Sequence, residues 1–166
     1  MKGCMAIDRQ KTETVHWHAV FTASRAEKKV RDRLEELGVE CFLPVQTVLR
    51  QWTYRKSRVV VPVIAGLVFV RVSRQEQVKV LQTKGVVAFL RLKGEAGAAV
   101  IPDKQMEDFR FLLDFSEEAV EMTNENIKAG DLVRVVKGSL RGMEGELIRH
   151  KGVTKVLVRI DMLGCA

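Results

Sequence analysis

The sequence predicts an α+β unit followed by a small all-β unit, and three observations carry this prediction. Up to residue 113, strand-forming stretches alternate with three amphipathic stretches that begin with helix-capping sequences. From residue 128 onward the pattern is entirely β. Residues 114–127 have five acidic side chains and no basic ones, a composition typical of a linker.

The first part of the α+β unit is expected to contain a strand, a helix and a hairpin. Residues 16–21 have strand-like side chains, and Ser24 and Glu27 form a capping box for a helix that Gly38 ends. Two strands over 45–52 and 58–62 follow, joined by the basic segment 54–57. The apolar residues that share one face of this helix are Ala26, Val30, Leu34 and Leu37.

The second part begins with a nearly continuous apolar run over 65–72, which predicts a buried central strand. A capping box at 73–76 predicts a short helix with Val78 and Leu81 inward, and a strand is expected over 86–90. Asp103 is expected to cap a third helix. The order β-α-β-β-β-α-β-α predicts helices on one side of a mainly antiparallel sheet. The expected inner stripe of the third helix is Met106, Phe109, Leu112 and Leu113.

The all-β unit shows three strand patterns, over 132–136, 144–150 and 153–160. Small closed barrels usually have about five short strands, so we expect the chain as given to lack the last strand. The first and third patterns are rich in β-branched residues, which favour a sheet over a helix.

The composition limits the classes of function that this chain can have. The chain has 166 residues, 46% of them hydrophobic and 30% charged, with a net charge of +7, and two basic units flank the acidic connector. Such charge fits a nucleic-acid partner and equally an ordinary solvated surface. The sequence has no apolar run of roughly 20 residues and no signal-peptide core, so we expect a cytoplasmic protein with a disordered tail over 1–14.

Catalytic and metal chemistry finds no support in the sequence. No phosphate-binding loop or nucleophile elbow is present, and we expect a protein that is not an enzyme and needs no cofactor. The cysteines are widely separated and are expected to be inert thiols. The residues considered and set aside are His16, His18, His150, Cys4, Cys41 and Cys165.

Residues 130–145 resemble the KOW motif, a hairpin of a small SH3-like barrel found in transcription elongation factors and some ribosomal proteins. Four further motifs resemble the NusG family of transcription elongation factors, which have an N-terminal NGN domain, a linker and a C-terminal KOW domain. Trp17-His18-Ala19-Val20 is similar to W-Y-x-V, residues 64–70 to F-P-G-Y-V-F-V, residues 84–89 to R-G-V-x-x-F, and Ile101-Pro102-Asp103 to I-P-D. Departures are His18, Ile64, Ala65 and Leu67.

The resemblance implies an NGN domain over 15–114, with an antiparallel sheet flanked by helices, a linker over 115–127 and a KOW barrel over 128–166. The KOW segment and the chain's ending are most similar to the UpxY type, a specialised group beside RfaH. That type is associated with antitermination in long capsular polysaccharide operons. Open alternatives are a general NusG-type elongation factor that couples to Rho or the ribosome, and a ribosome-associated KOW protein. An RNA-processing enzyme is a remote third.

The resemblance also implies that the NGN domain binds RNA polymerase. One set of residues would dock on the clamp helices of the largest subunit, and a second would reach the gate loop of the other large subunit. Core packing is the alternative for Trp17 and Phe69, and a solvated helix surface is the alternative for the second set. The first set is Trp17, His18, Ile64, Ala65, Leu67 and Phe69, and the second is Glu76, Gln77 and Val78.

Two basic surfaces are candidates for nucleic acid, either the non-template DNA strand or nascent RNA. The first matches positions where specialised relatives touch DNA, with a solvated helix face as its alternative. The second is the predicted hairpin, whose Trp52 and Tyr54 alternate with charges and suit either base stacking or packing. On the KOW side, Leu163 corresponds to a contact with a ribosomal small-subunit protein or Rho. The first surface is Arg25, Lys28, Lys29, Arg31, Arg33 and Lys84; the basic residues of the second are Arg50, Arg55, Lys56 and Arg58.

Overall fold

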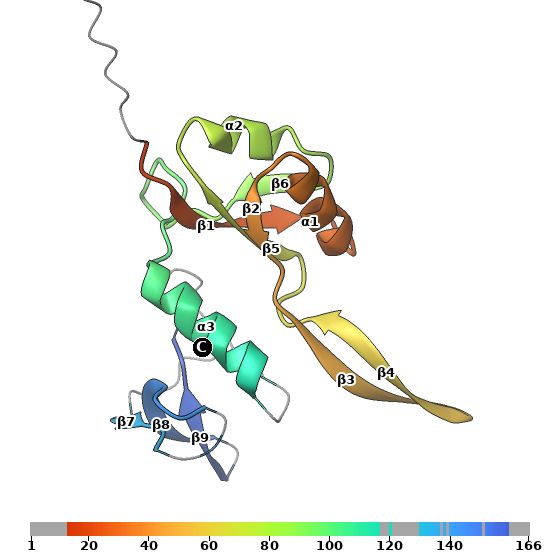
Figure 1. The fold of residues 1–166 in the computed structure, drawn as a ribbon, viewed down its shortest axis with the longest axis vertical. Coiled ribbons are helices and arrows are strands. Elements are labelled where there is room, and N and C mark those ends of the chain that lie inside the picture. Colours follow the sequence, from red (N-terminus) through yellow and green to blue (C-terminus); the bar gives the residue numbers. More distant parts are fainter. Residues whose placement is uncertain are drawn as a thin grey trace, which may run out of the picture.

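The computed structural model describes residues 13–116, 120, 130–136, 138, 140–150 and 152–159. Its elements are β1 (His16–Thr22), α1 (Glu27–Glu36), β2 (Glu40–Phe42), β3 (Val45–Trp52), β4 (Arg55–Pro62), β5 (Leu67–Val72), α2 (Glu76–Leu81), β6 (Val86–Phe89), α3 (Asp103–Phe115), β7 (Asp131–Arg134), β8 (Glu144–His150) and β9 (Val153–Leu157) (Figure 1). None of the described helices is long and apolar enough to span a membrane.

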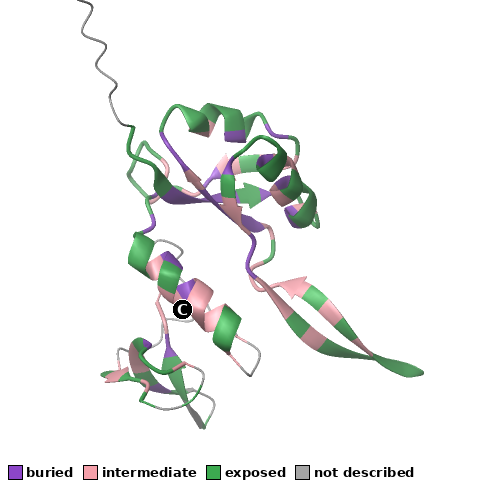
Figure 2. Ribbon diagram, viewed as in Figure 1, coloured by how far each residue is buried: buried purple, intermediate pink, exposed green. Residues whose placement is uncertain are grey.

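A four-stranded antiparallel sheet of order β2-β5-β1-β6 organises the N-terminal part. Buried residues follow β1 and β5 through its centre (Figure 2). The prediction of a buried central strand is confirmed over Leu67–Val72, where only Arg71 is not buried. Residues 65 and 66, which were expected to belong to this strand, form a turn instead. The short strand β2 was missed, because three residues are too few to show a period.

Helices cover both faces of this sheet, so the prediction of helices on one side was wrong. Alternate residues of a strand point to opposite faces. Val20 and Val68 pack with α1 and α2 in one core, whereas Ala19 and Phe69 pack with α3 in the other. Figure 1 shows α3 on the opposite side of the sheet from α1 and α2. Element order alone does not say to which face each connection leads.

The C-terminal end of α1 is formed as the sequence predicts, whereas its N-terminal end is not. At the C-terminus, Gly38 N donates to Glu35 O and Val39 N donates to Leu34 O, the two bonds of a Schellman motif. At the N-terminus no side chain caps the helix, so the capping box at Ser24 is wrong. Glu27 instead turns inward to Gly66.

The capping box of α2 is confirmed, whereas the predicted inward face is wrong. Ser73 N donates to the Glu76 carboxylate at 2.9 Å, and Glu76 N donates to Ser73 Oγ at 3.4 Å. Val78 and Leu81 are 58% and 44% exposed, and Val80 is the buried residue of this helix. Six residues make fewer than two turns, too few for a pattern to fix the inner face.

The third helix has its expected stripe but not its expected cap. Met106 and Phe109 are buried, and Leu112 and Leu113 are half-buried. Pro102 occupies the N-cap position and no side chain caps the helix. Asp103 is instead the first helical residue, where a carboxylate interacts favourably with the helix dipole.

The hairpin is confirmed with a tighter turn than expected. β3 and β4 pair antiparallel from Val45↔Pro62 to Trp52↔Arg55, leaving Thr53 and Tyr54 as the turn. The basic segment expected to form the loop therefore belongs largely to β4. The hairpin projects away from the four-stranded sheet (Figure 1).

The C-terminal part contains three antiparallel strands in the order β7-β8-β9. They fall where the sequence predicted strands, and the described residues there form no helix. Arg159 pairs with Glu146 on β8 at 2.8 Å. Most of the tail over 1–14, most of the linker over 115–127, and Leu163 lie outside the described residues.

Candidate functional site

The turn over 63–66, just before β5, is held in place by a buried carboxylate. Gly66 N donates to Glu27 Oε1 at 2.7 Å, and Thr22 N donates to Gly66 O at 2.9 Å. Gly66 has a φ of +72°, a conformation that side-chain-bearing residues rarely adopt. These contacts present Ile64 half-buried and Ala65 exposed at the end of the sheet.

Three residues expected at a polymerase contact lie in the core under α3. Trp17 and Phe69 are buried, and Leu67 is 4% exposed. The resemblance implies a polymerase contact for Leu67, but α3 covers this face of β5 and buries the Leu67 side chain. The guanidinium of Arg110 on α3 stacks 4.7 Å from the Trp17 ring and 4.6 Å from the Phe42 ring, which adds cation–π attraction to the packing.

Phe21 is an exposed apolar residue that the sequence interpretation missed. It pairs with Leu67 across β1 and β5 and is 42% exposed. Alternation in β1 places it on the same face as Trp17 and Ala19, beyond the part that α3 covers, and this period was the available signal. We call Phe21, Ile64 and Ala65 the turn patch.

His18 is a buried connecting residue. Its Nδ1 lies 2.8 Å from Ala99 O, and its Nε2 lies 3.4 Å from the Gln77 amide nitrogen. Nδ1 is therefore the donor, and Nε2 accepts from Gln77. Burial lowers the pKa of His18 below its ordinary value, although the Ala99 bond opposes this effect. His18 and Gln77 thus join β1 to α2, while Val78 remains exposed.

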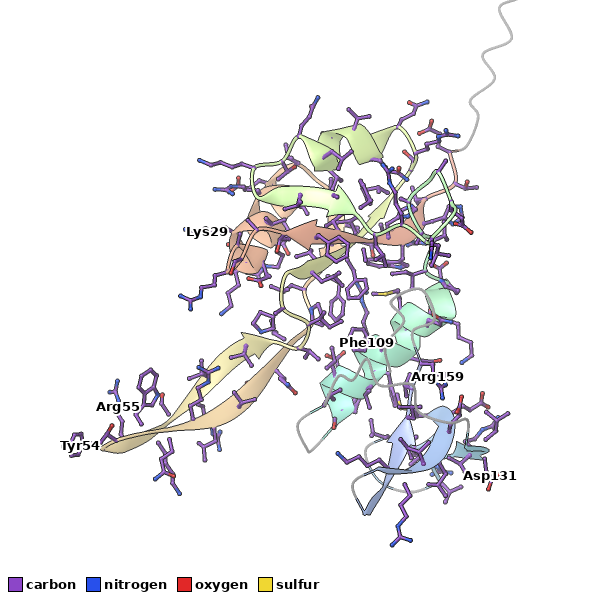
Figure 3. The ribbon with its side chains drawn as sticks, turned by 180° about the vertical axis from the view of Figure 1, so that it is seen from behind. Lys29, Tyr54, Arg55, Phe109, Asp131 and Arg159 are labelled. Atoms are coloured by element: carbon purple, nitrogen blue, oxygen red, sulfur yellow. The ribbon has the colours of Figure 1, made fainter. Side chains whose placement is uncertain are left out.

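The basic surface of α1 separates into engaged and available cations. Arg31 pairs with Asp32 at 2.6 Å, Arg33 donates to Lys84 O at 2.6 Å, and Lys28 donates to Val60 O at 3.3 Å. The remaining members of the surface, Arg25, Lys29 and Lys84, are exposed. Figure 3 labels Lys29 on α1.

The turn at 84–85 lies directly against α1. Ala23 N donates to Gly85 O at 2.8 Å. Gly85 has a φ of +102°, and a Cβ there would lie 2.8 Å from a Val30 methyl group. This contact requires glycine, and it holds Lys84 beside Arg33. Sequence-distant cations therefore form one surface.

The two hairpin aromatics are largely exposed. Trp52 is 58% exposed and Tyr54 is 98% exposed. Figure 3 shows Tyr54 and Arg55 at the far end of the hairpin. Among the described residues these exposures favour base stacking over packing, most clearly for Tyr54.

These features can be compared with known proteins. The family model described as "Transcription termination factor nusG" matches residues 15–110. The chain belongs to the NusG family. No curated protein matches it significantly. Among solved structures, a chain from "Domain interaction in Thermotoga maritima NusG" is 20% identical, with 92% of this chain and 96% of that chain covered and a TM-score of 0.42.

The NusG match covers all four motifs that carried the N-terminal resemblance, and it ends before the KOW-like segment. It identifies a transcription-factor family, and no catalytic family is indicated. Within the described part of this NusG chain, no group of His, Cys, Asp or Glu side chains could hold a metal ion. Burial raises the pKa of the Cys41 thiol to about 11, which leaves it protonated and unreactive at neutral pH.

Proposed function

We propose that this NusG-family protein binds RNA polymerase and increases the processivity of transcription on selected operons. The observation that carries the proposal is the family match over 15–110, together with the turn patch. Ile64 and Ala65 of this patch lie on a turn held by Glu27 and Thr22, and rigid presentation lowers the entropy cost of docking.

In this proposal the turn patch contacts the clamp helices of the largest polymerase subunit. Ile64 and Ala65 take the contacting role, with Phe21 added. Trp17, Leu67 and Phe69 are buried in the same core as α3, so they would support the contact from below. His18 would position α2 rather than touch the polymerase.

The N-terminal end of α2 would face the gate loop of the other large subunit. Val78 is exposed, and Glu76 and Gln77 are held by Ser73 and His18 respectively. A protein that contacts both subunits would hold the clamp closed and oppose pausing.

The basic surface of α1 would contact exposed non-template DNA. Arg25, Lys29 and Lys84 are exposed and suited to phosphates. Arg33 would instead hold the 84–85 turn in place through Lys84 O.

Operon selectivity and the C-terminal partner extend the proposal. The KOW-like sequence over 130–145 supports a UpxY-type antiterminator with a KOW barrel, and Leu163 would contact a ribosomal small-subunit protein or Rho. A general NusG-type factor is the second candidate, favoured by the description of the matching family as termination factors.

In vitro transcription separates these functions. Templates would pair a long capsular operon leader or an unrelated leader with the same downstream terminator. We expect increased readthrough only behind the operon leader. Equal readthrough on every template would indicate a general elongation factor, and reduced readthrough with Rho would indicate a termination factor. No effect on any template would contradict the proposed role in transcription.

A further inference from the structure

The β3–β4 hairpin carries charged and aromatic surface that has no part in the docking proposed above. Residues 45–62 include four basic side chains and no acidic ones. β3 and β4 have eight residues each, and at about 3.3 Å per residue such a strand is about 26 Å long. The hairpin therefore places its tip well away from the four-stranded sheet, as Figure 1 shows.

The strand register divides the cations between both faces of the tip. Trp52 pairs with Arg55, and Arg50 pairs with Ser57. Cross-strand partners share a face, so one face carries Trp52 between two arginines. Gln51↔Lys56 and Leu49↔Arg58 supply the cations of the opposite face, while Tyr54 occupies the turn.

The tip is not explained by contacts within the described chain. None of its four cations forms a salt bridge to a described residue. Tyr54 is almost fully exposed, and Trp52 is more than half exposed. Exposed aromatic rings beside cations that form no salt bridge to the described part of the chain complement a ligand that combines negative charge with flat apolar faces.

We propose that the hairpin tip binds single-stranded RNA. The four cations contact phosphates, and unpaired bases stack on Trp52 and Tyr54. Stacking of this kind requires bases that are not already stacked in a duplex. The exposed Gln51 and Thr53 flank Trp52 in sequence, where they can hydrogen-bond to ribose 2′-hydroxyls, which DNA lacks. This interaction does not depend on polymerase binding.

Fluorescence anisotropy of the full chain with a labelled, unstructured single-stranded RNA tests the proposal. Because one stacked base contributes roughly a ten-fold factor in affinity, W52A/Y54A is expected to weaken binding about a hundred-fold. R55Q/K56Q is expected to weaken binding and to reduce the slope of log K against log salt by about 1.4. The matched control R74Q/K93Q removes two exposed cations elsewhere and should bind like wild type.

Tryptophan emission gives a second readout. The chain has two tryptophans, and Trp17 is buried, so RNA should quench mainly Trp52, and W52F should lose that quenching. All hairpin variants should melt like wild type because the changed side chains are exposed.

Several results would overturn the inference. These are unchanged RNA affinity in both hairpin variants, equal affinity for single-stranded DNA of the same sequence, tighter binding to duplex DNA, or binding to anionic phosphatidylglycerol vesicles without binding to RNA. Loss of polymerase binding in A65D with RNA binding intact would support the inference, since the two surfaces would then be separate.

Discussion

Replacing Leu67 with aspartate should unfold the N-terminal part, although the family resemblance places this residue at a docking surface. Leu67 is 4% exposed and packs with Trp17, Phe69 and Phe109. Truncating a buried leucine costs about 2–5 kcal/mol, and burying a carboxylate adds a further penalty. The total approaches the 5–15 kcal/mol by which domains are typically stable.

Ala65→Asp is the matched control, because it adds the same charge two residues away at an exposed position. We expect A65D to melt like wild type and to lose polymerase in a pull-down. Circular dichroism melts and amide NMR spectra would be recorded for both variants. An L67D variant that melts like wild type while losing polymerase would show that Leu67 is a surface contact and that α3 does not cover it.

Three further predictions concern the supports of the site. Glu27→Ala leaves the Gly66 amide without its partner and should lower stability by about 1–3 kcal/mol in denaturant titrations, whereas E27Q should recover part of the loss by keeping an acceptor. Because the pKa of His18 is lowered in the fold, its stabilising effect is complete above the unfolded pKa of about 6.5 and is lost as pH falls toward the folded pKa. Wild type should therefore lose more stability than H18Q between about pH 7.5 and 5.5, and parallel losses would refute the role of His18. The double variant K29E/K84E should weaken recruitment to paused polymerase and flatten its salt dependence relative to R74E/K93E; equal effects in the two would mean that only net charge matters.

Long apolar patterns predicted the central elements well. The continuous run over 67–72 and the stripe of α3 each span enough residues to show a period, and both lie in the core. The capping box predicted from local sequence was confirmed at Ser73 and Glu76 but was wrong at Ser24. Glu27 is the reason for that failure, because it bonds to Gly66, 39 residues away. A local motif cannot show such a competing tertiary partner.

The candidate site was less predictable because it depends on which face each helix covers. The family motif indicates that Leu67 and Ala65 belong to one functional segment, but it does not distinguish the core residue from the exposed one. The sequence indicated only that Phe21 belongs to a strand, and its exposure became evident once the position of α3 on the sheet was known. The exposure of Trp52 and Tyr54 also required the hairpin to project from the sheet rather than fold onto it.

Site-specific photo-crosslinking from position 65 tests the central claim most directly. A benzophenone amino acid would replace Ala65 in the full chain, and the same group at the exposed Lys93 would be the control. The variants would be incubated with transcribing polymerase and the crosslinked peptides mapped. We predict crosslinks from position 65 to the clamp helices of the largest subunit and none there from position 93. Crosslinks from position 65 to ribosomal proteins alone, or equal crosslinking from both positions, would contradict docking through the turn patch.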